Sequence, residues 1–190
     1  MESNTLFEEY RGYKPQDFNG VLVILREPNA SDSGEKLPAD KAYEWIEKVL
    51  SRDDMWEGIQ QAKDKRAVRR YRHYFEKLLR QVFFGKKDRY HIAFDNIIPV
   101  KGGKSASKEY RQYQYFPERV KRIVDTIGPQ YVFLCADIYE KIKEPGDREN
   151  PGVVYAGKTL RCFSRDGVTY YAIYHPCAHI AIGSPAGSDL

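Results

Sequence analysis

The sequence predicts an α/β domain of three layers, in which a central, mainly parallel sheet of four strands lies between helices. Short apolar runs rich in β-branched residues recur along the chain, and helical periodicity fills much of the sequence between them. Such runs are typical of strands buried on both faces, as in parallel sheets. The length of 190 residues, without internal repeats, favours a single domain.

Composition narrows the class of protein. Lys and Arg total 31 against 27 Asp and Glu, and the resulting net charge of +4 permits a nucleic-acid partner without arguing for one. The longest apolar runs fall short of the about 18 residues of a membrane span, and the N-terminus lacks a signal-peptide pattern. The three cysteines are widely spaced and match neither a disulfide framework nor a metal site. We therefore expect a cytoplasmic monomer with no cofactor, no metal and no membrane association.

The first strand is predicted over residues 20–25, where an unbroken apolar run ends at Arg26-Glu27-Pro28-Asn29. Proline has no N–H for strand pairing, so the strand ends there. Ligands bind at the carboxyl ends of strands in open α/β sheets, which makes Glu27 a candidate site residue. The simpler interpretation is a strand-to-loop turn with a solvated glutamate.

The segments flanking this strand are expected to surround the sheet. Residues 1–19 are polar with scattered aromatic residues and are expected to wrap over it. A helix is predicted to begin at Pro38. Residues 57–84 predict a longer amphipathic helix or helix pair, whose basic side is either a phosphate-facing surface or a solvated face.

The second strand is predicted within residues 91–100, with Asn96 near its end. It leads into a loop containing Lys101, Lys104 and Ser105, which is flexible and polar enough to approach a phosphate. The simpler alternatives are that Asn96 is a turn or cap residue and that the loop is merely solvated.

The third strand is predicted over residues 131–135. The helix before it begins at Pro117 and stops at Gly128-Pro129, and a short helix over about 137–142 follows it. After a turn-rich connector at 144–152, residues 159–174 predict a hairpin whose turn contains Asp166-Gly167. Its last strand runs to His175-Pro176, and the tail from 183 to 190 is expected to be flexible.

Three of these strands end alike, in an apolar run followed by a polar residue and then proline. The polar residues are Glu27, Asn96 and His175. Because the carboxyl ends of parallel strands lie at one edge of a sheet, we expect a carboxylate, an amide and an imidazole to face one crevice.

At these residues the sequence resembles the uracil-DNA glycosylase superfamily. Residues 25–29 (Leu-Arg-Glu-Pro-Asn) stand where the family has a motif such as GQDPYH or GINPG, whose residue before proline positions the attacking water. Asn96 matches the asparagine that reads the base, and His175-Pro176-Cys177 matches a His-Pro-Ser motif. The resemblance spans roughly residues 20–182.

The resemblance implies a monofunctional hydrolase of DNA repair by base excision, which removes uracil or a related deaminated base from single- or double-stranded DNA. Glu27 would activate water, His175 would stabilise the departing base, and Asn96 would read it. The other residues implied in base or substrate binding are Arg26, Pro28, Asn29 and Cys177. Those implied in DNA binding are Lys101, Lys104, Ser105, Ala178, His179 and Ile180, the last at the place of the intercalating wedge.

The sequence also departs from the family pattern. Glu27 is one methylene longer than the usual Asp or Asn, Asn29 replaces an aromatic residue that excludes thymine in one branch, and the expected stacking phenylalanine is missing. Because Arg26 stands next to Glu27 and could pair with it, and because the stacking aromatic is missing, the alternative is a non-catalytic module of the same fold that binds nucleic acid or a nucleotide. A third alternative is a different α/β hydrolase or transferase acting on a small nucleoside.

Overall fold

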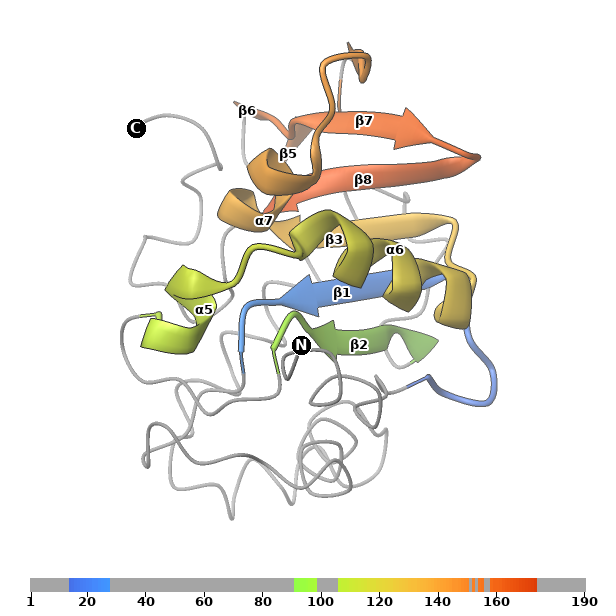
Figure 1. The fold of residues 1–190 in the computed structure, drawn as a ribbon. Coiled ribbons are helices and arrows are strands. Elements are labelled where there is room, and N and C mark those ends of the chain that lie inside the picture. Colours follow the sequence, from blue (N-terminus) through green and yellow to red (C-terminus); the bar gives the residue numbers. More distant parts are fainter. Residues whose placement is uncertain are drawn as a thin grey trace.

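A six-stranded mixed sheet forms the centre of this computed structural model, which describes residues 14–27, 91–98, 106–150, 152, 154–155 and 158–173 (Figure 1). The order of the strands across the sheet is β2-β1-β3-β8-β7-β4. They are β1 (Val21–Leu25), β2 (Ala93–Asn96), β3 (Tyr131–Cys135), β4 (Glu149–Asn150), β7 (Cys162–Arg165) and β8 (Val168–Ile173). A separate antiparallel pair is formed by β5 (Val154–Tyr155) and β6 (Lys158–Thr159). The α/β class is as predicted.

The sheet is larger than the four strands that the sequence predicts. Strands β2, β1, β3 and β8 are parallel to one another and make up the expected parallel part. Strand β7 then pairs antiparallel with β8, and β4 pairs antiparallel with β7. The prediction missed β4 because it has only two residues, both exposed, and therefore lacks an apolar pattern.

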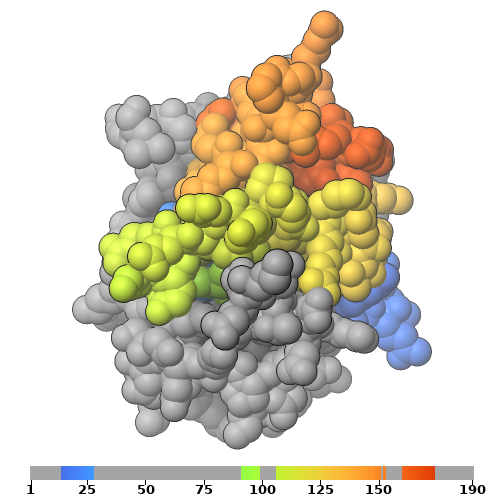
Figure 2. Space-filling view, in the orientation of Figure 1, coloured from blue at the N-terminus to red at the C-terminus, as the bar shows by residue number. Residues whose placement is uncertain are grey.

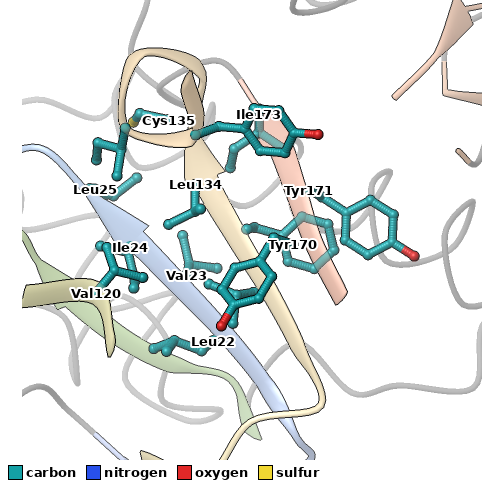
Figure 3. Close-up of a cluster of buried hydrophobic side chains, with 14 of the residues drawn as sticks. Leu22, Val23, Ile24, Leu25, Val120, Leu134, Cys135, Tyr170, Tyr171 and Ile173 are labelled. Atoms are coloured by element: carbon teal, nitrogen blue, oxygen red, sulfur yellow. The ribbon is translucent and has the colours of Figure 1, made fainter. Parts of the chain in front are cut away.

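Strand β1 lies inside the sheet between β2 and β3, and all five of its residues are buried. Burying a Val, Leu or Ile side chain stabilises a protein by about 1.5–3 kcal/mol, so this run accounts for a large share of the core. Figure 3 shows aliphatic side chains of β1 and β3 in one cluster with the aromatic rings of β8. The strand begins after Gly20, whose φ of +85° is a conformation that side chains disfavour.

Helix α6 (Phe116–Ile127) is the longest helix of the described part, and it confirms the helix predicted from Pro117. Val120, Ile123 and Ile127 are buried at the expected spacing. The helix ends at Gly128, which adopts the left-handed conformation (φ +68°) and donates its N–H to the carbonyl of Val124 at 2.8 Å. This is the glycine stop that the sequence predicts.

Two shorter helices flank α6. Helix α7 (Ala136–Ile142) follows β3 directly and agrees with the short helix predicted there. Helix α5 (Lys108–Gln112), with Ser107 as its N-cap, is absent from the sequence prediction. In the space-filling view, residues 106–127 form a continuous band across this face of the molecule (Figure 2).

Helices α6 and α7 pack on the same face of the sheet. From α6, Arg119 contacts Asp95 of β2, and from α7 the ring of Tyr139 lies 5.1 Å from that of Phe163 in β7. The helices predicted from Pro38 and over 57–84, which would form the third layer, lie outside the described residues.

The predicted hairpin is present as β7 and β8. Asp166 and Gly167 have φ values of +52° and +78°, as a two-residue turn between antiparallel strands requires. Of the N-terminal stretch, Lys14 donates to the carbonyl of Ile127 at 2.8 Å, and Phe18 packs against the core. The predicted flexible tail lies outside the described residues. Among the helices that the structure describes, none has the length and apolar character needed to cross a bilayer.

Candidate functional site

The carboxyl ends of β2, β1, β3 and β8 meet at one edge of the sheet, called here the carboxyl edge (Figure 1). Leu25 of β1 is in register with Asn96 of β2, and Cys135 of β3 with Ile173 of β8. Glu27 follows β1 at this edge, so the structure brings Glu27 and Asn96 to the ends of neighbouring parallel strands.

Glu27 is buried, with an exposed fraction of 7%, and its carboxylate is hydrogen-bonded on both oxygens. The backbone N–H of Ser107 donates to Oε1 at 2.8 Å, and the Ser107 hydroxyl donates to Oε2 at 2.5 Å. The same Ser107 Oγ accepts the backbone N–H of Tyr110 at 3.0 Å and so caps α5. Glu27 is therefore not the solvated side chain of the simpler interpretation.

Arg26 forms its ion pair with Asp137, in the first turn of α7, and among the described residues it makes none with Glu27. Its Nε lies 3.0 Å from Asp137 Oδ2, and the Tyr110 hydroxyl donates to that same oxygen at 2.7 Å. Burial, followed by the charge of Asp137, raises the pKa of Tyr110 above its ordinary value of 10.0, which keeps the phenol protonated as a donor. Because Arg26 pairs with Asp137, Arg26 does not occupy the Glu27 carboxylate, which accepts its hydrogen bonds from Ser107.

Cys135, the last residue of β3, lies at the same edge but is fully enclosed. Burial raises the pKa of its thiol to about 12. A thiol needs to ionise to act as a nucleophile, so Cys135 is a packing residue rather than a reactive one.

Asn96 is also buried, and its backbone is fixed by a network around Arg119 of α6. Arg119 Nη2 donates to the carbonyl of Asn96 at 3.3 Å and lies 3.4 Å from Asp95 Oδ1, while Nε donates to the carbonyl of Ile97 at 3.2 Å. Asp95 Oδ1 in turn accepts the N–H of Asn96 at 2.7 Å. The end of β2 is thus held from the side of α6.

The remaining predicted site residues lie outside the described part of the chain. For His175, the structure shows that β8 ends at Ile173, two positions earlier, at the carboxyl edge. The others are Pro28, Asn29, Lys101, Lys104, Ser105, Cys177, Ala178, His179 and Ile180.

Sequence reasoning missed the residues that hold the site together. Ser107 precedes a short segment with Glu109 in its first turn, which is an N-cap signal. Asp137 stands near the end of a strand, but no proline follows it, so it does not fit the pattern of a polar residue before proline. Arg119 comes three residues after the buried Phe116 and therefore lies toward the inner side of α6.

The carboxylates of this edge already have protein partners, namely Ser107 for Glu27 and Arg26 with Tyr110 for Asp137. Within the described residues, no group of three or more His, Cys, Asp or Glu side chains is placed to hold a metal ion. The site therefore offers an oriented carboxylate that follows β1, next to the strand that ends in Asn96.

No protein-family model and no curated protein matches this chain. The likeness to the uracil-DNA glycosylase superfamily remains a resemblance of three short motifs, at residues 25–29, at Asn96 and at 175–177.

Proposed function

We propose that the chain is a glycosylase of the uracil-DNA glycosylase type, which hydrolyses the N-glycosidic bond of uracil or a related deaminated base in DNA. The observation that carries the proposal is the buried carboxylate of Glu27 at the carboxyl edge, beside the strand that ends in Asn96. This edge is where open α/β sheets bind their ligands.

In the proposed reaction, water adds to C1′ of the sugar while the bond from C1′ to the base nitrogen breaks. The base leaves with the bonding electron pair, and the proton of the water passes to Glu27. A carboxylate can accept about four hydrogen bonds, of which Ser107 uses two, so Glu27 keeps acceptor capacity for a water. Its negative charge also stabilises the positive charge that develops on the sugar.

Asn96 is the proposed reader of the base. An amide presents a donor and an acceptor side by side, which matches O4 and N3–H of uracil and mismatches the amine and ring acceptor of cytosine. Arg119 and Asp95 support this role because they fix the backbone around Asn96. Asp95 accepts the N–H of Asn96, and Arg119 donates to the carbonyls of Asn96 and Ile97. A base reaches such a residue only when it is flipped from the duplex or presented on a single strand.

His175 is the proposed donor to the base oxygen that gains negative charge. The assignment rests on the His-Pro-Cys motif and on its place in the sequence, two residues after β8. Removing one donor of this kind typically lowers the rate by about 10²–10³-fold.

The test is base release from oligonucleotides that carry one uracil, in single- and double-stranded form, followed by alkaline cleavage at the abasic site. The wild type is expected to give cleavage. Glu27→Gln keeps the size of the side chain but removes its charge, so excision should fall by about 10²-fold or more. Oligonucleotide affinity, measured by fluorescence anisotropy, should change little.

Glu149→Gln is the matched control, because it makes the same change in β4, away from the carboxyl edge, and is expected to cut at the wild-type rate. If Glu27→Gln kept wild-type activity, the proposed role of Glu27 in the reaction would be wrong. His175→Ala, assayed in parallel, should lose activity as well.

A non-catalytic module that binds nucleic acid or a nucleotide is the second candidate. It is favoured by the structural task that Glu27 already performs, since both of its oxygens hold the N-terminus of α5. This candidate predicts salt-dependent oligonucleotide binding without release of uracil, hypoxanthine, xanthine or mismatched thymine. The absence of both binding and release would exclude the two candidates together.

A further inference from the structure

The contact between Glu27 and Ser107 joins parts of the chain that are 80 residues apart. Ser107 approaches the carboxylate with two different donors, its backbone N–H and its hydroxyl, and each donates to a separate oxygen. Two hydrogen bonds to two oxygens fix both the position and the rotation of a carboxylate, as a single bond does not.

The Ser107 hydroxyl is itself held in direction. Its oxygen accepts the N–H of Tyr110 at 3.0 Å, while its hydrogen donates to Glu27 at 2.5 Å. The hydroxyl that meets the carboxylate therefore belongs to a continuous chain of hydrogen bonds that starts in the backbone of α5, and successive bonds in such a chain polarise one another.

A second hydrogen bond of similar kind anchors the same helix elsewhere. The Tyr110 hydroxyl donates to Asp137 at 2.7 Å, so two carboxylates of the carboxyl edge hold α5. Of these two hydroxyl bonds, the one from Ser107 reaches Glu27 and the one from Tyr110 reaches Asp137. Comparing the two therefore distinguishes two possible roles of Ser107, which are to anchor the helix and to orient the Glu27 carboxylate.

We propose that Ser107 is a positioning residue for Glu27, which fixes the carboxylate so that its remaining lone pairs meet the attacking water. This inference rests on the proposed hydrolysis of the glycosidic bond. It adds that the geometry of the reaction depends on a side chain that contacts neither the base nor the sugar. Catalysis is sensitive to such placement, since an error of about 1 Å costs on the order of 100-fold in rate.

The experiment compares kcat and KM for uracil release by the chain of 190 residues. Ser107→Ala removes the hydroxyl and keeps the backbone N–H, so kcat should fall about 10- to 100-fold while KM stays near the wild-type value. Ser107→Thr keeps a hydroxyl and should restore most of kcat. Ser107→Gly is the second variant without a hydroxyl, because glycine is nearly as good an N-cap and is expected to leave α5 formed.

Tyr110→Phe is the matched control for anchoring. It removes a hydroxyl bond to a carboxylate from the same helix, but the carboxylate is that of Asp137. Wild-type kcat in Tyr110→Phe, together with a lowered kcat in Ser107→Ala or Ser107→Gly, supports a positioning role. An equal loss in Tyr110→Phe would overturn it and leave Ser107 as an anchor.

The inference and the proposed function fail in different ways. If the wild type releases base and both variants without the hydroxyl keep its kcat, the role of Ser107 is wrong and the function stands. If the wild type releases no base from any of the substrates, the function is wrong and the role of Ser107 falls with it.

Discussion

The two flanks of the sheet are each held by an arginine, and the two arginines differ in burial. On the β2 side, Arg119 and Asp95 have side-chain exposures of 4% and 3%. On the β4 side, Arg161 and Glu149 have exposures of 36% and 34%, and Arg161 also pairs with Glu140. In the first pair, Arg119 donates to backbone carbonyls at the end of β2, whereas the second pair belongs to a surface network that Lys143 extends.

The comparison shows that the number of ion pairs on a flank is a poor measure of how much they stabilise the fold. Breaking a buried pair leaves an uncompensated charge in the protein interior, at a cost of about 3–5 kcal/mol. An exposed pair is screened by water and contributes about 0–1 kcal/mol, even when its distances are short. Among the described residues the β2 flank has fewer ionic contacts than the β4 flank, yet we expect it to be the more sensitive of the two.

The largest effect is expected from Arg119→Ala. The change removes the ion pair between Arg119 and the buried Asp95 carboxylate, together with the donor to the carbonyls of Asn96 and Ile97. The free energy of unfolding should fall by about 3–5 kcal/mol, measured by urea denaturation. A loss below about 1 kcal/mol would place Arg119 in the same class as a surface arginine and contradict the comparison.

An intermediate effect is expected at Asp147, whose partner is Arg165 of β7. Burial alone would raise the pKa of Asp147, but hydrogen bonds from Arg165 and from the N–H of Glu144 outweigh it and hold the pKa below its ordinary value of 3.8. The ionised form is therefore favoured by folding, and its contribution is complete above pH 3.8 and is lost as the pH falls below it.

The test is Asp147→Asn, followed by urea denaturation from pH 7 down to pH 3. At pH 7 the variant should be less stable by about 1–2 kcal/mol. The difference from the wild type should narrow as the pH falls below 3.8. A difference that stays constant over the whole range would show that the charge of Asp147 plays no part.

The smallest effect is expected from Arg161→Ala on the exposed flank. Although Arg161 contacts both Glu149 and Glu140, the free energy of unfolding should change by about 0–1 kcal/mol. The difference should shrink further in 1 M salt, because exposed pairs are screened. A loss as large as that of Arg119→Ala would mean that burial does not explain the contrast.

The sequence predicted best where a single physical signal dominates. The apolar run of β1, the inward spacing of α6 with its stop at Gly128, and the Asp166-Gly167 turn all agree with the structure. Each of these signals is local. A strand buried on both faces, the period of a helix and a left-handed glycine can each be recognised within a few residues. The placement of Glu27 and Asn96 at one edge also followed from the parallel order of the strands.

Contacts between distant residues could not be predicted in this way. Nothing near Glu27 in the sequence indicates that Ser107 binds it, and proximity to Arg26 suggested an ion pair that the structure replaces with Asp137. Strand β4 and helix α5 were missed because two and five residues are too few to show a period.

The carboxyl edge has a consequence for how the chain reaches this fold. The partners of Glu27 and Arg26 lie 80 and 111 residues away along the chain, whereas β7 and β8 meet across a two-residue turn. Closing a long loop costs entropy before any contact rewards it, so local pairs form early and distant ones late. We therefore expect the hairpin to form before the carboxyl edge, so that the residues proposed for catalysis come together late in folding.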